Sequence, residues 1–139
     1  MSPADVRPRP ASPNRGLPAR LVDGHHELEA ACADFLQELA ADPHTLACHW
    51  HALDAALRDH MAAEEELLFP DYQLVAPEDG DALRTDHALL RELLHDVGRD
   101  VQRHQLHEGR LRQLVALLHA HAARENASLY VWAESAQRL

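Results

Sequence analysis

Apolar residues recur every three to four positions along most of the chain, a spacing that places them on one face of an α-helix. Asp42-Pro43, Ala76-Pro77 and the region of Gly98 interrupt this pattern. The pattern therefore predicts four helices, near residues 20–41, 44–75, 79–98 and 106–136. Four helices of this length joined by short turns favour an all-α fold, an up-down-up-down antiparallel four-helix bundle.

The composition supports this fold class and limits the function. Hydrophobic residues make up 46% of the 139 residues and aromatic residues only 4%, which is typical of one domain built on leucine and alanine. The formal charge of −10 argues against a nucleic-acid or membrane partner, because both require a basic surface. Cys32 and Cys48 form no C-x-x-C motif, and no apolar stretch reaches the roughly 18 residues of a membrane span. With no secretory signal at the N-terminus, these features predict a cytoplasmic protein.

The first eighteen residues differ from the rest of the chain. They hold five of the eight prolines, with Arg7, Arg9 and Arg15 among them. Such a composition does not bury a core, so it predicts a disordered Pro/Arg-rich arm over residues 1–18 and a helical bundle over residues 19–139. The arm is also the segment through which a protein partner would dock, if the protein has one.

Histidines lie on every predicted apolar stripe. In the first helix His25 continues the stripe and His26 does not, although a shift of the helix by one residue would exchange the two. The other polar residues on the stripes are His60, Glu64, His87, His121 and Glu125. The remaining histidines off the stripes or near helix ends are expected on solvated faces, namely His44, His49, His51, His95, His107 and His119.

The six inward polar residues share one end of the predicted bundle. The histidines of the first and third helices lie early in their helices, and the two H-x-x-x-E pairs lie late in the second and fourth. In an up-down-up-down bundle these positions meet at one level. A single buried histidine is ordinary when it is hydrogen-bonded, but four imidazoles and two carboxylates in one small core are costly to desolvate unless something neutralises them.

This set of side chains is suited to two metal ions. Two carboxylates can each bridge ions about 3.5 to 4 Å apart, and four imidazoles then give each ion two nitrogens and two oxygens. An oxo or hydroxo bridge would add a fifth ligand. Mixed imidazole and carboxylate ligation suits iron, with zinc and manganese as competitors. A ferritin-like site lacks its second E-x-x-H motif here, and a haem held by two histidines would leave both glutamates buried without a role.

Four stretches of the sequence resemble the hemerythrin-like, or HHE cation-binding, family: "DGHHEL", "HMAAEEELLFP", "RTDHALL" and "HAHAARENASLYVWAE". The resemblance runs from about residue 20 to residue 136. It implies a four-helix bundle with a non-haem centre of two Fe ions, oxo- or hydroxo-bridged, that meets dioxygen, nitric oxide or peroxide. The metal ligands that it implies are His25, His60, Glu64, His87, His121 and Glu125.

The chain departs from the oxygen-carrying members of that family at two places. Those proteins have a fifth histidine one turn before the ligand of the third helix, where this chain has Leu83, and their last pair reads H-x-x-x-x-D. The resemblance therefore favours a di-iron protein that binds, senses or reacts with a small ligand. The alternatives are a peroxide-disproportionating or nitric-oxide-reducing enzyme and an iron storage or delivery protein. No substrate-pocket motif decides whether the chain is an enzyme.

Overall fold

The computed structural model describes residues 17–137, which form helices and contain no strand. The helices are α1 (Leu17–Gln37), α2 (Pro43–Leu67), α3 (Phe69–Val75), α4 (Pro77–Gln102), α5 (Glu108–Ala127) and α6 (Leu129–Gln137). The predicted all-α class is thereby confirmed. Residues 1–16, which make up most of the predicted arm, lie outside the described residues. None of the helices in the described range has the length and apolar character that a membrane span requires.

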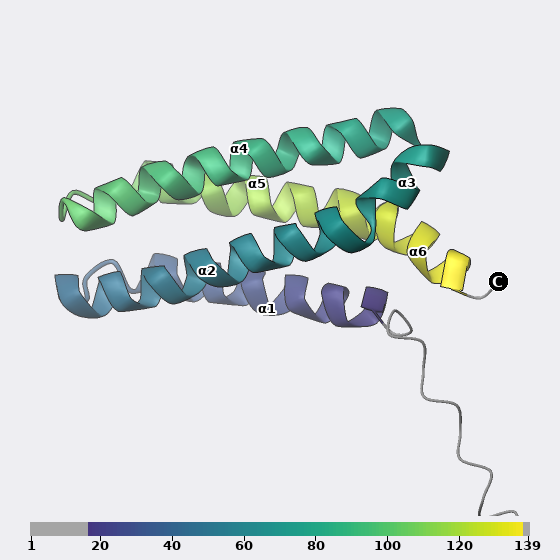
Figure 1. Cartoon of the computed structure of the whole chain (residues 1–139). Helices are drawn as coiled ribbons and strands as arrows, with labels where there is room; N and C mark the ends of the chain where they lie inside the picture. Colours follow the sequence, from purple (N-terminus) through teal and green to yellow (C-terminus); the bar gives the residue numbers. More distant parts are fainter. Residues whose placement is uncertain (1–16, 138–139) are drawn as a thin grey trace, which may run out of the picture.

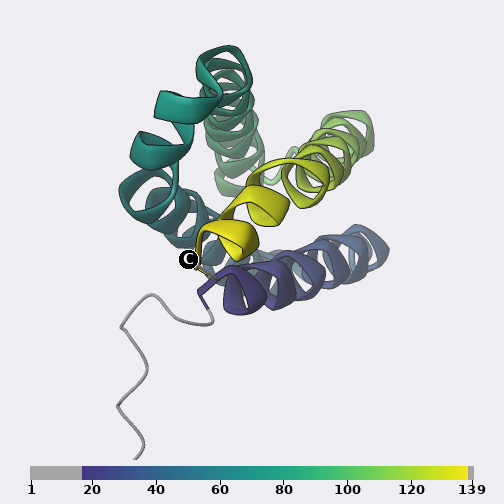
Figure 2. The same ribbon diagram turned by 90° about the vertical axis from the view of Figure 1, so that its right-hand side faces the viewer.

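The four long helices lie side by side (Figure 1). α1 contacts α2 and α5, and α4 contacts the same two helices, so the four enclose a common core. The short helices α3 and α6 lie at the same end of the molecule, which faces the viewer in Figure 2. The two short helices contact each other there. That end is also where α1 begins.

The predicted second helix is interrupted at Leu68, so its prediction as one element over residues 44–75 is wrong. Pro70 has no backbone N–H to donate, and its ring clashes with the carbonyl group of Glu66 one turn earlier, so the helix does not continue unbroken through it. The chain turns at Leu68, with φ −119° and ψ −46°, and α3 begins at Phe69. Burial differs between two neighbours at this turn, because Leu68 is buried whereas Leu67, three residues after Glu64, is 42% exposed.

The predicted fourth helix is interrupted in the same way, at Ser128. The Ser128 hydroxyl donates to the carbonyl oxygen of Arg124 at 2.9 Å, a bond to the preceding turn that bends helices. The chain resumes as α6 at Leu129. Leu129 and Tyr130 are buried, whereas Trp132 is only partly buried.

The predicted helix end near Gly98 is also wrong, because α4 continues to Gln102. A Cβ atom at Gly98 would lie 3.3 Å from Trp50 Nε1, so the glycine allows Trp50 of α2 to pack closely against α4. The chain leaves the helix a few residues later, where His104 has a φ of 53°. Gly98 thus serves packing within the helix and not its termination.

Two groups of buried apolar residues hold the helices together. The larger core lies among the four long helices and includes Leu94, Leu111 and Leu114. The smaller core brings Phe69 of α3 and Leu129 of α6 together with residues from the adjacent ends of the long helices. Burial of this apolar surface is the main stabilising contribution to the fold.

Leu114→Ala should lower the free energy of unfolding by about 2–5 kcal/mol, because Leu114 is fully buried in the larger core and its truncation leaves a cavity. Leu89→Ala is the matched control, since Leu89 is 45% exposed, and should change the same quantity by about 0.5 kcal/mol or less. Urea denaturation followed by circular dichroism measures both. Equal losses would contradict the placement of the core.

Candidate metal centre

The six polar residues predicted to face inward meet in one layer of the structure, here called the polar layer: His25, His60, Glu64, His87, His121 and Glu125. They come from all four long helices. Five of them are at most 3% exposed, and the His60 side chain is 11% exposed. His60 approaches α1 closely, because a Cβ atom on Gly24 would lie 3.2 Å from His60 Nδ1.

The polar layer lies between the two apolar cores. On α1, Leu21 belongs to the smaller core and Leu28 to the larger, with His25 between them. On α4, His87 lies in the same way between Leu83 of the smaller core and Leu90 of the larger. Along α2 and α5 the larger core comes first, and the smaller core follows the layer at Leu68 and Leu129. Water is thus excluded from both sides, which strengthens electrostatic contacts within the layer.

The Glu125 carboxylate lies close to three of the four imidazoles. Its Oε1 atom lies 2.9 Å from His25 Nε2 and 3.0 Å from His121 Nε2. Its Oε2 atom lies 3.8 Å from His87 Nε2. This carboxylate therefore spans histidines of α1, α4 and α5.

Glu64 faces the same point from α2. Its Oε1 atom lies 3.4 Å from His87 Nε2 and 3.7 Å from His60 Nε2. Its Oε2 atom lies 3.7 Å from His25 Nε2. Both carboxylates thus face His25 of α1 and His87 of α4, as carboxylates shared between two metal ions would.

Several of the atoms that face one another have no hydrogen-bond partner despite being buried. They are Glu64 Oε1, His87 Nε2, His121 Nε2 and both carboxylate oxygens of Glu125. Buried polar atoms are satisfied in the great majority of cases, and an exception indicates an ion or another unfilled role. These are nitrogen and oxygen donors of the kind that bind first-row transition metals, so the residues fit a metal centre.

The donor atoms divide into two groups that share Glu64. One group contains Glu64, His87, His121 and Glu125, and the other contains His25, His60 and Glu64. Within each group the ligand atoms lie within 4.8 Å of one another. Each group thus contains two imidazoles and could hold a metal ion.

The charges within the layer compensate one another. Burial, with the neighbouring charge of Glu125, raises the pKa of Glu64 to about 7. Burial opposes ionisation of Glu125 as well, but contacts with His121 and His25 outweigh it and lower the Glu125 pKa. Although burial lowers the pKa of His87, its contacts with the two carboxylates raise that pKa to about 9. Protons therefore provide, in part, the positive charge that the two carboxylates require.

Carboxylates outside the layer hold two of the histidines. Glu65 Oε2 lies 2.8 Å from His87 Nδ1, and Arg91 donates to both oxygens of Glu65 at 2.7 Å. The carboxylate leaves Nε2 of His87 directed into the layer. A histidine fixed in this way is a better metal ligand, because its ring orientation and tautomer are set in advance.

Asp86 holds His121 in the same way. Asp86 Oδ2 lies 3.0 Å from His121 Nδ1 and 3.2 Å from an Arg124 nitrogen. His25 is different, because its Nδ1 atom has no hydrogen-bond partner. The two metal positions are therefore unequal in their surroundings.

Glu65, Asp86 and Tyr130 are site residues that the sequence reasoning missed. The two acids stand next to predicted ligands in the sequence, Glu65 after Glu64 and Asp86 before His87, and this adjacency was a usable signal. Tyr130 is off the predicted stripe and reaches the layer only because the helix is interrupted at Ser128. Its hydroxyl donates to Glu64 Oε2 at 2.6 Å.

The histidines outside the polar layer are exposed. His26 is exposed next to the buried His25, which is the register that the apolar stripe predicts. His44, His49, His51, His95, His107 and His119, expected on solvated faces, are all exposed.

A small cavity borders the polar layer on the side of the larger core. Its volume is about 10 Å³, and its walls include Leu57, Leu90, Leu94 and Leu118 together with His60. Such a volume accommodates about one water-sized molecule. The polar layer thus borders an internal space that can hold one very small molecule.

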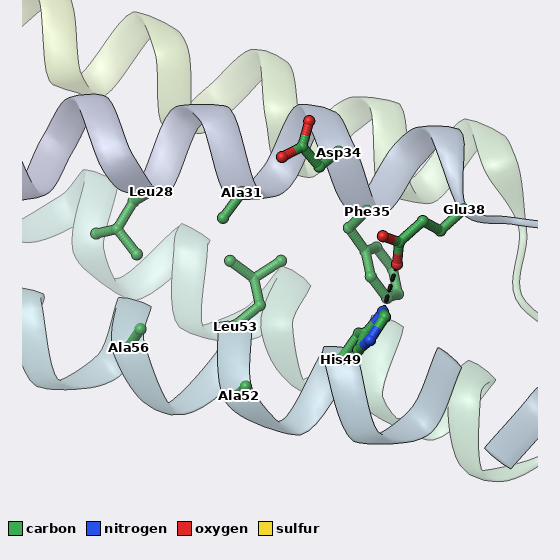
Figure 3. Close-up of a pocket in the computed structure, with 9 residues that line it drawn as sticks. All are labelled: Leu28, Ala31, Asp34, Phe35, Glu38, His49, Ala52, Leu53 and Ala56. Atoms are coloured by element: carbon green, nitrogen blue, oxygen red, sulfur yellow. Dashed lines mark hydrogen bonds and ion pairs between the residues drawn. The ribbon is translucent and has the colours of Figure 1, made fainter. Parts of the chain in front are cut away.

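A larger groove lies between α1 and α2, further from the polar layer (Figure 3). Its volume is about 370 Å³, and alanines such as Ala31, Ala52 and Ala56 leave it open. His49 and Glu38 pair across one end of it. No residue of the polar layer lines this groove.

Comparison with known protein families matches residues 17–133 to one family, described as the hemerythrin HHE cation binding domain. The matched range contains the whole polar layer and most of the described residues. No curated protein and no solved structure matches the chain.

His25→Ala should lower the metal content of the purified protein, because it removes one of the two imidazoles of a metal position. His26→Ala is the matched control and should leave the metal content unchanged, since its side chain is exposed. Elemental analysis of both variants measures the effect. Equal losses would show that the exposed neighbour also binds metal.

Glu65→Gln should weaken metal binding about 10- to 100-fold at the position that His87 serves, because the amide orients His87 less firmly than the carboxylate. The neighbouring Glu66 is exposed, so Glu66→Gln should bind metal as the unmodified protein does. Competition with a chelator of known affinity gives the constants. Unchanged binding in Glu65→Gln would exclude this orienting role.

Proposed function

The chain belongs to the hemerythrin HHE cation-binding domain family, and on that premise we propose that it is a non-haem di-iron protein that binds or senses a small ligand such as dioxygen, nitric oxide or peroxide. The four long helices would serve as the up-down-up-down bundle that holds the centre. The proposed metal ligands are the six residues of the polar layer.

The observation that carries this proposal is the group of buried donor atoms without hydrogen-bond partners, contributed by Glu64, His87, His121 and Glu125. A purely structural cluster would pair these atoms with one another, because each unpaired buried polar atom costs about 1–3 kcal/mol. Here the nitrogens and oxygens approach to ion-pair distances without hydrogen-bond geometry. Such an arrangement supports a metal ion as the common partner of these donor atoms.

The number and kind of donors support two iron ions. Two groups of ligand atoms share Glu64, and each contains two imidazoles. Iron accepts mixed nitrogen and oxygen ligation readily, and a pair of ions bridged by carboxylates is the arrangement that shared glutamates favour. When bound, such a pair supplies redox chemistry with small oxidants, which the side chains alone do not have.

The surroundings of the layer support a small ligand over a larger substrate. The adjoining cavity measures about 10 Å³ and has leucine walls. Such a space admits about one water-sized molecule and is far too small for an organic substrate. This size limit supports binding or sensing of a small molecule and gives no support to a role in storing many ions.

Leu83 affects whether the protein would bind dioxygen reversibly or react with it. It is fully buried one turn before His87, where an imidazole would reach the metal position of His87 and His121. A leucine cannot ligate, so that position has one nitrogen ligand fewer than in the oxygen carriers. We propose on this basis that the protein responds to its ligand by reacting with it, and does not carry dioxygen reversibly.

Purified protein should contain close to two irons per chain, and its optical spectrum should change on addition of nitric oxide or peroxide. Removal of the metal by a chelator should lower the melting temperature by about 10 °C, because metal bound only to the native state stabilises it. A single tightly held zinc, or a melting curve unaffected by complete chelation, would refute the proposal. Sustained consumption of peroxide over many cycles would favour the enzyme alternative.

A further inference from the structure

Tyr130 directs its hydroxyl at one of the two metal positions. The residue is 4% exposed, and its oxygen lies 3.2 Å from His25 Nε2 and 3.5 Å from His60 Nε2, besides its bond to Glu64. These three partners are the complete donor group of one metal position. The hydroxyl therefore faces the space that the three donors enclose.

The distances match those between ligands of one metal ion. Metal–ligand bonds of about 2.0–2.2 Å place neighbouring ligand atoms roughly 3 Å apart when they stand at right angles. The Tyr130 oxygen lies 2.6, 3.2 and 3.5 Å from the three donor atoms. These distances are those that a further ligand of the same ion would have.

The two groups of donor atoms differ in size, and Tyr130 lies beside the smaller one. The group with His87 and His121 contains four residues, whereas the group with His25 and His60 contains three. The Tyr130 hydroxyl oxygen would be a fourth donor atom for the group of His25, His60 and Glu64. We propose that Tyr130 is a direct ligand of the metal held by His25 and His60, an inference that rests on the proposed di-iron function.

Binding of Tyr130 to a metal ion would release one proton, that of its hydroxyl group. In the metal-free protein Tyr130 is a phenol whose hydroxyl donates a hydrogen bond to Glu64. On metal binding its O–H bond breaks, a bond forms between its oxygen and the metal, and the proton passes to solvent. The charge of the ion replaces the proton, as it does at other sites where cations bind acidic side chains. A phenolate is an established ligand of ferric iron in proteins.

The chain is well suited to a test, because it contains only two tyrosines. Tyr72 is the matched control: it is buried on α3 and donates to Asp79 at 2.5 Å, with no contact to the polar layer. The protein, Tyr130→Phe and Tyr72→Phe are each loaded with iron(II) and oxidised in air. Visible absorption and resonance Raman spectra are then recorded, together with the iron content.

We expect a phenolate-to-iron(III) charge-transfer band, with tyrosine ring modes in the Raman spectrum, in the unmodified protein and in Tyr72→Phe. Tyr130→Phe should lose both signals completely. Growth of Tyr72→Phe on ring-deuterated tyrosine labels Tyr130 alone, and its Raman modes should shift even if Tyr130→Phe does not fold.

Two results would overturn the inference while leaving the proposed function intact. The first is an iron-loaded protein without the phenolate signals, which would reduce Tyr130 to a hydrogen-bond donor that positions Glu64. The second is persistence of the signals in Tyr130→Phe. Failure of the unmodified protein to bind iron would instead overturn both the inference and the proposed function.

Discussion

The burial of two carboxylates and four imidazoles in a single layer is the constraint on which the rest of the structure depends. Charges are stable in such a place only when opposite charges and hydrogen bonds surround them. The layer places its carboxylates against imidazoles, and further carboxylates held by Arg91 and Arg124 fix two of the rings from outside. The apolar cores on both sides then fix the level at which the four long helices pack. A change in helix register would bury these charges without partners.

The two short helices complete the layer from one end. Each follows a glutamate of the layer by about one helical turn, after the interruptions at Leu68 and Ser128. α3 brings the Phe69 ring to 4.9 Å from the ring of His87, and α6 brings Tyr130 to Glu64. In an uninterrupted helix each of these side chains, five residues after its glutamate, would point about 140° away from it. The two interruptions thus allow Phe69 and Tyr130 to cover the polar layer at this end.

The sequence predicted what depends on regular helical periodicity. The stripe through Leu83, His87 and Leu90 is buried throughout, and the polar residues meet because helix lengths fix their level. The interruptions were missed because they depend on one proline and one serine hydroxyl, whose local effects compete with a stronger apolar pattern. Tyr130 was missed for the same reason, since its position follows from the interruption and not from the stripe. Contacts between helices, such as Asp86 with His121, depend on rotation of each helix about its axis, which spacing within one helix does not determine.

Leu28 belongs to the walls of both the groove between α1 and α2 and the small cavity beside the polar layer. The thickness of one side chain therefore separates the outside of the molecule from the space next to the centre. A gas molecule crossing at this place would wait for a rotation of that side chain, which is a much faster event than the separation of two packed helices. A small dissolved molecule could therefore enter the cavity on the timescale of side-chain rotation, without the helices separating.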